Sequence, residues 1–344
     1  MTKVFEIKDK VFKFCAEYEA YLIYLYKFLA ALALFCLINN GIGFMEKIST
    51  FPVALLLALI CCLLPQSTTI IVGAGLVLLN LYVLSLEVAL TALIIFAIIF
   101  LLYFRFAPRD GMLFILTPIM FGLKIPYILP IGTGLLRKAY SVIAVVCGTI
   151  TFYFLDGIYQ NVTTLSSVVA GGETEITAKM SVTISQLLMN KEMYLVIAVF
   201  SLSAIMVSVI RKLSIDHAWK IAIVSGVLIQ ISGLFAGYLL FSISEKTVGM
   251  LVGNIVALLL GFLIEFLFMD LDYSRTERVQ FEDDDYYYYV KAVPKKMVTS
   301  SEKTVKQFNG FSSNEKNEFA KESNKNMNRK KIAEELEIDE DLLK

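Results

Sequence analysis

Residues 51–136 read FPVALLLALICCLLPQSTTIIVGAGLVLLNLYVLSLEVALTALIIFAIIFLLYFRFAPRDGMLFILTPIMFGLKIPYILPIGTGLL, and this stretch decides the fold. It is apolar enough to lie in a membrane, yet it holds six of the seven prolines of the chain: Pro52, Pro65, Pro108, Pro118, Pro126 and Pro130. A proline inside a helix removes a backbone donor and clashes with the preceding turn. In lipid, such interruptions persist only where protein or a water-filled cavity covers the exposed backbone. The stretch therefore predicts broken helices in the working region of a membrane protein.

The overall composition places the chain among membrane proteins. Hydrophobic residues make up 57% of its 344 residues, and the mean hydropathy is +0.70. Soluble domains contain only about 45–50% apolar residues. The 31 basic and 31 acidic residues cancel, so net charge indicates no nucleic-acid partner. We therefore expect an all-α, polytopic helical membrane protein whose surroundings are the lipid bilayer.

The sequence carries no recognisable metal or catalytic motif. Its five cysteines include no C-x-x-C pair, and His217 is its one histidine. The usual soft ligands therefore do not assemble into a metal site. A nucleophile elbow, a P-loop, an HExxH motif and a paired-carboxylate pattern are all missing from the sequence. We predict a protein without a cofactor or metal that is not an enzyme, and a membrane-embedded lipid enzyme ranks third among the functions considered.

The first residues predict a basic amphipathic segment followed by a spanning helix. Residues 1–20 intersperse lysines with apolar side chains, a pattern typical of a segment lying on the cytoplasmic membrane surface. We favour this interpretation over a signal peptide because no small-x-small cleavage site follows the apolar run. Residues 21–43 predict the first span, and residues 21–157 together predict a Pro-broken transmembrane half.

Two segments of this half are too short to cross a bilayer. The run Phe51–Leu64 has 14 residues and reaches about 21 Å of a hydrocarbon core that is about 30 Å thick. Residues 112–136 form two shorter runs with basic residues at both outer ends, Arg109 and Arg137. Basic flanks favour the cytoplasmic side. We therefore predict a re-entrant hairpin over residues 112–136, with two full spans as the alternative.

The second half predicts a more regular bundle. Residues 158–192 contain few basic residues, so we expect an extracytoplasmic loop, with an amphipathic stretch over residues 176–188. Residues 193–269 hold three apolar runs that predict a three-helix transmembrane half: Met193–Ile210, Ala218–Phe241 and Val248–Met269. The positions of the basic clusters favour one topology. It has eight spans plus the Pro-broken hairpin, or eight to ten segments in all, with both termini in the cytoplasm.

Paired interruptions point to a binding site. Pro52 and Pro65 are 13 residues apart, Pro118 and Pro130 are 12 apart, and each second proline opens a polar patch. Short Pro- and Gly-interrupted segments in corresponding places are the sequence sign of a transporter's substrate site. The alternative is that these prolines only kink ordinary helices. We expect the two patches to meet near mid-membrane in a solute path formed by these residues: Pro65, Gln66, Ser67, Thr68, Lys124, Pro126, Pro130 and Thr133.

The role predicted for Lys124 depends on how deep the hairpin lies. A cation at bilayer depth costs about 2.5–3.5 kcal/mol, so it must be paired, hydrated or close to the surface. In a deep hairpin Lys124 faces an anionic solute or a carboxylate such as Glu87 or Asp156. In a shallow hairpin its amine reaches the cytoplasmic headgroups.

Further polar residues lie inside the predicted spans. Glu265 stands near the inner end of the last span, where it either takes part in proton or cation coupling or is an interfacial carboxylate. Three uncharged residues are interpreted as interhelical hydrogen-bonding groups, with a place along the solute path as the alternative: Asn80, Gln230 and Asn254.

Residues 270–344 predict a polar cytoplasmic tail. Residues 295–330 resemble a disordered linker in composition, and residues 329–344 regain helical spacing that suits binding to a partner. Before them, the tyrosine run has strong β-propensity and no predicted sheet of its own. We expect it to join the edge of a partner's sheet, with contact to inner headgroups as the alternative. The residues concerned are Asp283, Asp284, Asp285, Tyr286, Tyr287, Tyr288 and Tyr289.

Three stretches carry a resemblance to a known family. They are ILTPIMFGLKIPYILPI (115–131), LSIDHAWKIA (213–222) and the tail segment LDYSRTERVQFEDDDYYYYVKAVPK (271–295). Together they resemble a family of uncharacterised, permease-like polytopic membrane proteins of bacteria. The resemblance implies a bacterial cytoplasmic membrane and implies no particular chemistry.

These patterns together favour one function and leave one alternative. The paired interruptions favour a permease-type transport component. The alternative is a membrane scaffold that recruits cytoplasmic partners through residues 270–344. Either function is compatible with a homo- or hetero-oligomer.

Overall fold

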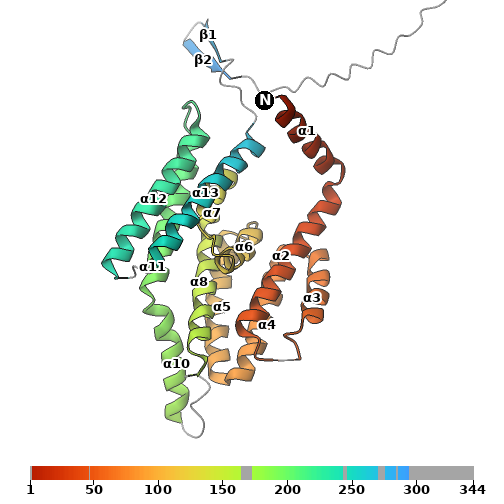
Figure 1. Ribbon diagram of the computed structural model, residues 1–344, viewed down its shortest axis with the longest axis vertical. Coiled ribbons are helices and arrows are strands. Elements are labelled where there is room, and N and C mark those ends of the chain that lie inside the picture. Colours follow the sequence, from red (N-terminus) through yellow and green to blue (C-terminus); the bar gives the residue numbers. More distant parts are fainter. Residues whose placement is uncertain are drawn as a thin grey trace, which may run out of the picture. The chain divides into compact units, whose positions relative to one another are not determined.

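The computed structural model describes residues 2–45, 47–163, 173–242, 246–269, 276–283 and 286–293. The predictions for residues 295–330, for residues 329–344 and for Asp284 and Asp285 lie outside these ranges. Within them the chain is helical apart from connecting turns and one pair of strands (Figure 1).

The apolar runs of the first half form helices that end where polar residues or prolines interrupt them. The basic amphipathic lead-in is helix α1, and Tyr18 separates it from the first long apolar helix. The bounds are α1 (Thr2–Glu17), α2 (Glu19–Ile42), α3 (Phe51–Leu63), α4 (Gln66–Leu84) and α5 (Leu86–Phe106).

The predicted hairpin and the second half follow the same rule. The hairpin consists of α6 (Gly111–Gly122) and α7 (Ile128–Leu136), and the turn η1 (Ala139–Ser141) leads into α8 (Val142–Gln160). The remaining helices are α10 (Glu173–Leu188), α11 (Lys191–Ile210), α12 (Ala218–Leu240) and α13 (Thr247–Phe268).

Seven helices of the described chain are long and apolar enough to cross a membrane: α2, α4, α5, α8 with η1, α11, α12 and α13. Helices α3 and α6 are apolar but have only 13 and 12 residues, so at 1.5 Å per residue they reach about 20 Å. The predicted class, an α-helical protein with many apolar helices of membrane-spanning length, is therefore present in the structure.

The segment between the two halves is more ordered than we expected. Residues 158–192 were predicted as a loop with an amphipathic stretch over residues 176–188. Instead, α8 continues to Gln160 and α10 covers 16 residues from Glu173 to Leu188. The amphipathic stretch predicted over residues 176–188 lies within α10, which begins three residues earlier and ends at the same residue.

Most of the prolines lie at the starts of helices or in turns instead of inside helices, which corrects our expectation. Pro52 lies in the first turn of α3, and Pro65 directly precedes α4. A proline is tolerated at both places because the first amides of a helix lack partners in any case. Of the six, Pro118 alone lies in the interior of a described helix, and it is buried in α6.

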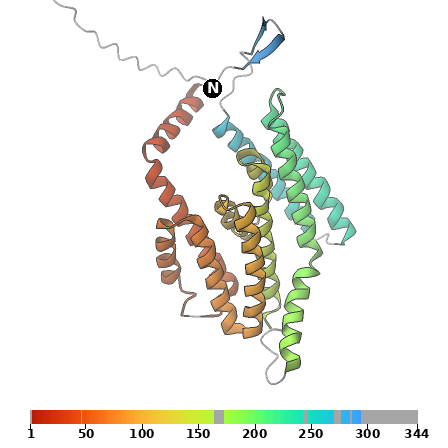
Figure 2. The ribbon, with the colours of Figure 1, turned by 180° about the vertical axis from the view of Figure 1, so that it is seen from behind.

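Buried side chains form three clusters, and two of these lie among the same helices and count together as one group. One group lies among α2–α6 and α8 and includes Phe35, Leu81 and Tyr103. The other lies among α7, α8 and α11–α13 and includes Ile131 and Leu234. Helix α6 packs against both α2 and α8, and both ribbon views show it between these helices (Figures 1 and 2). The α6–α7 hairpin therefore joins the two groups.

Small residues let helices approach closely where the hairpin packs. A Cβ added to Gly134 of α7 would lie 2.6 Å from the Cβ of Val207 and 2.8 Å from the carbonyl oxygen of Ala204, both in α11. A Cβ on Gly148 of α8 would lie 2.6 Å from the Cβ of Thr117 in α6. Close backbone approach at small residues is a main source of helix association in lipid.

The first helix is fastened to the last long one. The amine of Lys8 donates to the carbonyl oxygens of Phe266 and Met269, at 2.7 and 3.5 Å. It also lies 5.3 Å from the centroid of the Phe266 ring. These carbonyls close α13, where backbone oxygens lack helical partners and a cation is favoured.

The tyrosine run does have a sheet of its own, contrary to our prediction. Strands β1 (Glu277–Glu282) and β2 (Tyr287–Ala292) form an antiparallel pair in which Phe281 faces Tyr288. The two rings stack with centroids 4.9 Å apart. Sequence reasoning overlooked β1 because its alternation of Val279 and Phe281 with polar residues is short and lies beside an acidic run.

Candidate functional site

The α6–α7 hairpin starts and ends at the same place. The buried carboxylate of Asp110, which precedes α6, lies 3.7 Å from Nε of Arg137, which follows α7. Arg211, directly after α11, donates two hydrogen bonds from its guanidinium. Nη2 donates to the carbonyl oxygen of Arg137 at 2.6 Å, and Nη1 donates to that of Leu135. Burial lowers the pKa of the Arg211 guanidinium, but arginine stays charged in proteins. These contacts satisfy the last carbonyls of α7 and fix the mouth of the hairpin.

The tip of the hairpin lies halfway along two long helices. On one side of the tip, Phe121 stacks on Phe152 with ring centroids 4.7 Å apart. On the other side, Tyr127 meets Phe200 edge to face at 6.1 Å. Phe152 and Phe200 stand near the middle of α8 (142–160) and α11 (191–210). The α6–α7 segment therefore reaches mid-bundle and returns.

Lys124 lies in this turn with an exposed side chain and a φ of 62°. That left-handed conformation is uncommon for a residue with a Cβ. Pro126, two residues later, is buried. Lys124 therefore lies at the level of the middle of α8 and α11, and whether it faces a solute or the headgroups stays a prediction.

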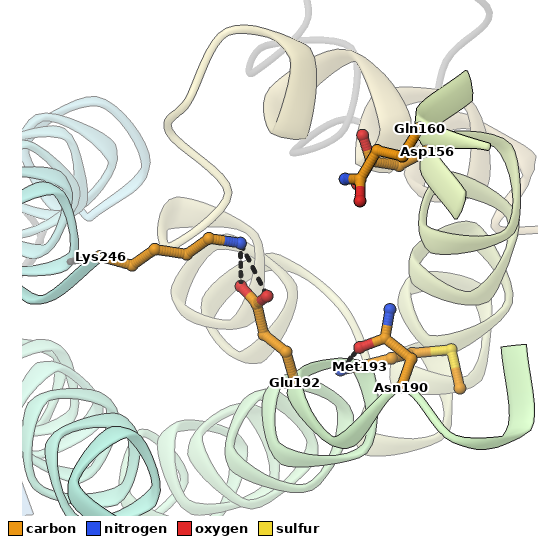
Figure 3. A network of polar contacts seen from close by, with 6 residues as sticks. All are labelled: Asp156, Gln160, Asn190, Glu192, Met193 and Lys246. Carbon is orange, nitrogen blue, oxygen red and sulfur yellow. Dashed lines mark hydrogen bonds and ion pairs between the residues drawn. The ribbon is translucent and has the colours of Figure 1, made fainter. Parts of the chain in front are cut away.

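Beyond the tip lies a group of polar side chains that the sequence did not reveal. The Glu192 carboxylate accepts two hydrogen bonds from the Lys246 amine, at 2.7 and 2.9 Å. Asp156 accepts one from Gln160 at 2.7 Å. Figure 3 shows the ion pair with Asp156 and Gln160 on the neighbouring helix. Asp156 is close enough to feel the charges of both members of the pair.

Three tyrosines extend this polar group toward the hairpin tip. The side chains of Tyr127 and Tyr238 lie close to each other, and Glu192 lies close enough to act electrostatically on both and on Tyr153. Tyr153 and Tyr238 are buried. The ring of Tyr127 packs directly against Gly253 of α13, where a Cβ would leave it no space. Residues from α8, α11, α12 and the hairpin therefore surround one carboxylate.

A cavity of about 350 Å³ lies between α2 and α8, beside this polar group. Its wall contains Leu37, Ile38, Asn40, Gly41, Ile42, Pro118, Phe152, Leu155, Asp156 and Tyr159. Pro118 places α6 at its inner limit, and the exposed Tyr159 places its mouth near the end of α8. A space of this size falls within the range of small-molecule sites.

The two predicted polar patches do not meet, which corrects that part of our prediction. Gln66 donates to the Tyr26 hydroxyl at 3.1 Å and packs on Gly111, beside the mouth of the hairpin. Ser67 lies close to the side chain of Tyr103. Pro65 is exposed, and Thr68 is half-buried in the first turn of α4. The first patch is therefore the first turn of helix α4.

The second patch lies elsewhere, within α7. Pro130 and Thr133 are buried, and α7 packs against α11 and α13. The Thr133 hydroxyl has no hydrogen-bond partner among the described residues. Proline spacing suggested that both patches face one space. In the structure the first patch contacts α2 and the start of α6, whereas the helix that carries the second packs against α11 and α13.

The intramembrane polar residues have varied surroundings. Asn80 accepts from the backbone amide of Met45 and the hydroxyl of Ser49, both at 3.0 Å, and so holds the α2–α3 turn. Gln230 donates to Ser203 at 3.1 Å and joins α12 to α11. Asn254 donates to the carbonyl of Met250 in its own helix. Glu265 is largely buried in α13, one residue before the Phe266 carbonyl that binds Lys8.

Sequence reasoning missed Glu192, Lys246 and the three tyrosines. Charged residues and tyrosines near the ends of apolar runs are typical of the membrane interface. Interpreting them as interface residues gives no reason to expect that they come together in one polar group. One signal was available: Tyr153 and Asp156 are three residues apart, so they lie on the same side of a helix.

Comparisons with known proteins give no relative of this chain: no family model, no curated protein and no solved structure matches it. Function therefore has to be inferred from the chemistry and geometry of the site itself.

Proposed function

We propose that the protein is a permease-type transport component of a bacterial cytoplasmic membrane. The cavity between α2 and α8 is the outward end of its solute path. The observation that carries this proposal is the α6–α7 hairpin. Its tip lies halfway along α8 and α11, and the cavity lies beside it. In lipid, chain that turns at mid-depth must be covered by protein or line a water-filled space, and transporters use such discontinuous helices to form substrate sites.

The proposed topology has eight spans and one re-entrant hairpin. Helices α2, α4, α5, α8, α11, α12 and α13 span the bilayer, and the shorter α3 is an eighth span in locally thinned lipid. Helices α6 and α7 enter and leave on the cytoplasmic side, where Arg109, Arg137 and Arg211 lie. Basic residues at inner ends agree with this orientation, and it places both termini in the cytoplasm.

In this scheme the hairpin is the inner barrier of the path. Phe121, Tyr127, Phe152 and Phe200 form a continuous set of ring contacts around its tip. The cavity reaches Pro118 and Phe152 from the other side. The described conformation is therefore open outward and closed inward, and transport requires the hairpin to shift against α8 and α11.

Thiol accessibility tests the path, in a chain whose five native cysteines are replaced by alanine. Leu155→Cys, in the wall of the cavity, reacts with a charged thiol reagent added outside intact cells. Phe154→Cys, the matched control, is its neighbour on α8 but is buried against Phe96, so it stays unmodified. A Leu155→Cys protein that is as unreactive as the control contradicts an outward-open path.

The second candidate function is a membrane scaffold, which the β1–β2 hairpin favours. One face of this hairpin carries Val279, Phe281, Tyr288 and Val290, and each side chain is more than a third exposed. An isolated two-stranded hairpin is only marginally stable in water, so an aromatic face of this kind suits a protein partner. Tyr286, Tyr287 and Tyr289 are also exposed, and Asp283 precedes them.

Crosslinking in cells tests the scaffold function. A photoreactive side chain at Phe281 captures a cytoplasmic protein, whereas the same group at Gln280, on the opposite face of β1, does not. Tyr288→Ser removes the stacked ring and abolishes capture. If Phe281 and Gln280 give the same products, the apolar face is not a docking surface.

A further inference from the structure

The cavity between α2 and α8 adjoins a smaller apolar space. The second space, of about 40 Å³, lies among α2, α4, α5, α6 and α8. The two share four wall residues: Leu37, Ile38, Pro118 and Leu155. They are therefore adjacent, a wide outer part and a narrow inner part, separated by these shared side chains beside α6.

The inner part is built to hold hydrocarbon. Its wall includes Leu34, Val77, Phe96, Phe100 and Phe114. Thr151 is the one described wall residue with a hydroxyl, and that hydroxyl already donates to the carbonyl of Cys147 at 2.9 Å. A water needs about 10–15 Å³ of such space and two to four polar partners. By this measure the inner part has room for about three water-sized groups, enough for the end of a slender alkyl chain, but it lacks the polar partners that would hold water.

The outer part is built to hold a positive charge. Asp156 is the charged residue in its described wall, accompanied by the amide of Asn40 and the ring of Tyr159. The nearby Glu192 is matched by Lys246 through two hydrogen bonds, whereas Asp156 accepts its hydrogen bond from the neutral amide of Gln160. The cavity therefore faces a carboxylate that forms no ion pair with a described residue. An aromatic ring beside it also favours an organic cation.

From this pairing we infer that the site takes a single-chain amphipathic cation: a slender alkyl chain in the inner part and an ammonium group facing Asp156. This rests on the proposed function, because it names the class of solute for the same path. A neutral alkyl compound would leave Asp156 without a counter-charge, and an anionic one would be repelled by it. A fused-ring compound would not fit the narrow inner part.

Protection of Leu155→Cys by small amphiphiles tests the inference, using the full-length alanine-substituted chain in lipid nanodiscs. Octyltrimethylammonium slows modification of the cysteine at concentrations where octanol and octyl sulfate do not. Asp156→Asn raises the concentration needed for half protection about tenfold. Asp156→Glu retains the preference for the cation, which shows that the site is still folded. Glu87→Gln is the matched control: it removes a carboxylate that does not line the cavity, and it leaves protection unchanged.

Each other outcome overturns a defined part of the scheme. If Leu155→Cys reacts but the three amphiphiles protect equally or not at all, the outward path stands and the inferred solute class is wrong. If octyl sulfate protects best, the charge assignment is wrong. If Asp156→Asn and Glu87→Gln behave alike, Asp156 does not recognise the cation. If Leu155→Cys never reacts, the transport proposal and the inference both fall.

Discussion

At the scale of single residues, a glycine sets the spacing between α7 and α11. Gly134→Leu places side-chain atoms where Val207 and Ala204 already lie, so the helices must separate. Overpacking of this kind typically costs about 1–3 kcal/mol. We expect a lower midpoint of thermal unfolding for the purified protein in detergent. Light scattering during heating, which reports aggregation of the unfolded protein, measures it.

Gly75→Ala is the control for this change, because nothing lies within 4 Å of a Cβ added there. Alanine is preferred over glycine in a helix by about 1 kcal/mol, so this variant melts no lower than the parent. If both glycine variants lose the same stability, close packing at Gly134 is not what holds α7.

A second residue-scale prediction concerns Asn80. Asn80→Leu leaves the Met45 amide and the Ser49 hydroxyl without their acceptor, and such a loss costs about 1–3 kcal/mol for each buried group left unsatisfied. Ser49→Ala removes only one of the two bonds and loses less. Because the two residues share a bond, the double variant should be less destabilised than the sum of the single variants. Strict additivity in the unfolding free energies would contradict the assigned network.

Asn80 also shows what a sequence can and cannot give at this scale. A polar residue within an apolar run predicts a hydrogen bond in the bundle, because an unsatisfied amide in hydrocarbon is costly. Its partner stays unknown, since Met45 and Ser49 lie more than 30 residues away in the chain. The same applies to Asp156, whose role depends on residues from two other helices.

At the scale of elements, Arg211 holds the mouth of the hairpin. Arg211→Gln removes both donors to the carbonyls that end α7. The amides near Arg137 should then open more readily, because hydrogen exchange reports local unfolding free energies. A loss of about 1.4 kcal/mol corresponds to a tenfold increase in exchange rate. Mass spectrometry of the exchanged protein measures it.

Lys212→Gln is the matched control for the hairpin mouth. Lys212 is the next residue, its side chain is exposed, and the same unit of charge is lost. In the Lys212→Gln protein, the backbone amides near Arg137 should exchange hydrogen at the same rate as in the parent protein. Equal acceleration in both variants would show that charge, and not the contact with α7, controls the hairpin.

The bounds of the helices were largely predictable, whereas their breaks were not. Long apolar runs ended by prolines or charges fix where helices start and stop, and α11 to α13 fall within two residues of the expected runs. Proline spacing did not tell an end of a helix from an interruption inside one. Pro65 and Pro118 look alike in sequence, yet one precedes α4 and the other lies within α6.

At the scale of the whole molecule, the proposed topology makes a prediction about sidedness. Met189→Cys, before α11, and Leu213→Cys, after it, are both well exposed. In the alanine-substituted chain, an impermeant thiol reagent should label Met189→Cys in intact cells. It should label Leu213→Cys only after the membrane is opened. Labelling of both from the same side would contradict α11 as a span.

The pairing of Glu192 with Lys246 belongs to this scale as well. These residues are 54 positions apart, and each begins a different long helix. Sequence patterns assign such charges to the interface one by one, because only the packing of the helices brings them together. The cavity beside them escaped prediction for the same reason: its wall combines residues of α2, α6 and α8.

The bond from Lys8 to the end of α13 has a consequence for biosynthesis. A ribosome makes Lys8 more than 250 residues before it makes the carbonyls that receive its amine. In the proposed topology, helix α1 therefore lacks its contact with α13 while every intervening helix enters the bilayer. The contact between Lys8 and α13 therefore forms only after the last span is in place. A nascent chain arrested before α13 lacks this contact, and its basic first helix stays accessible to quality-control proteases.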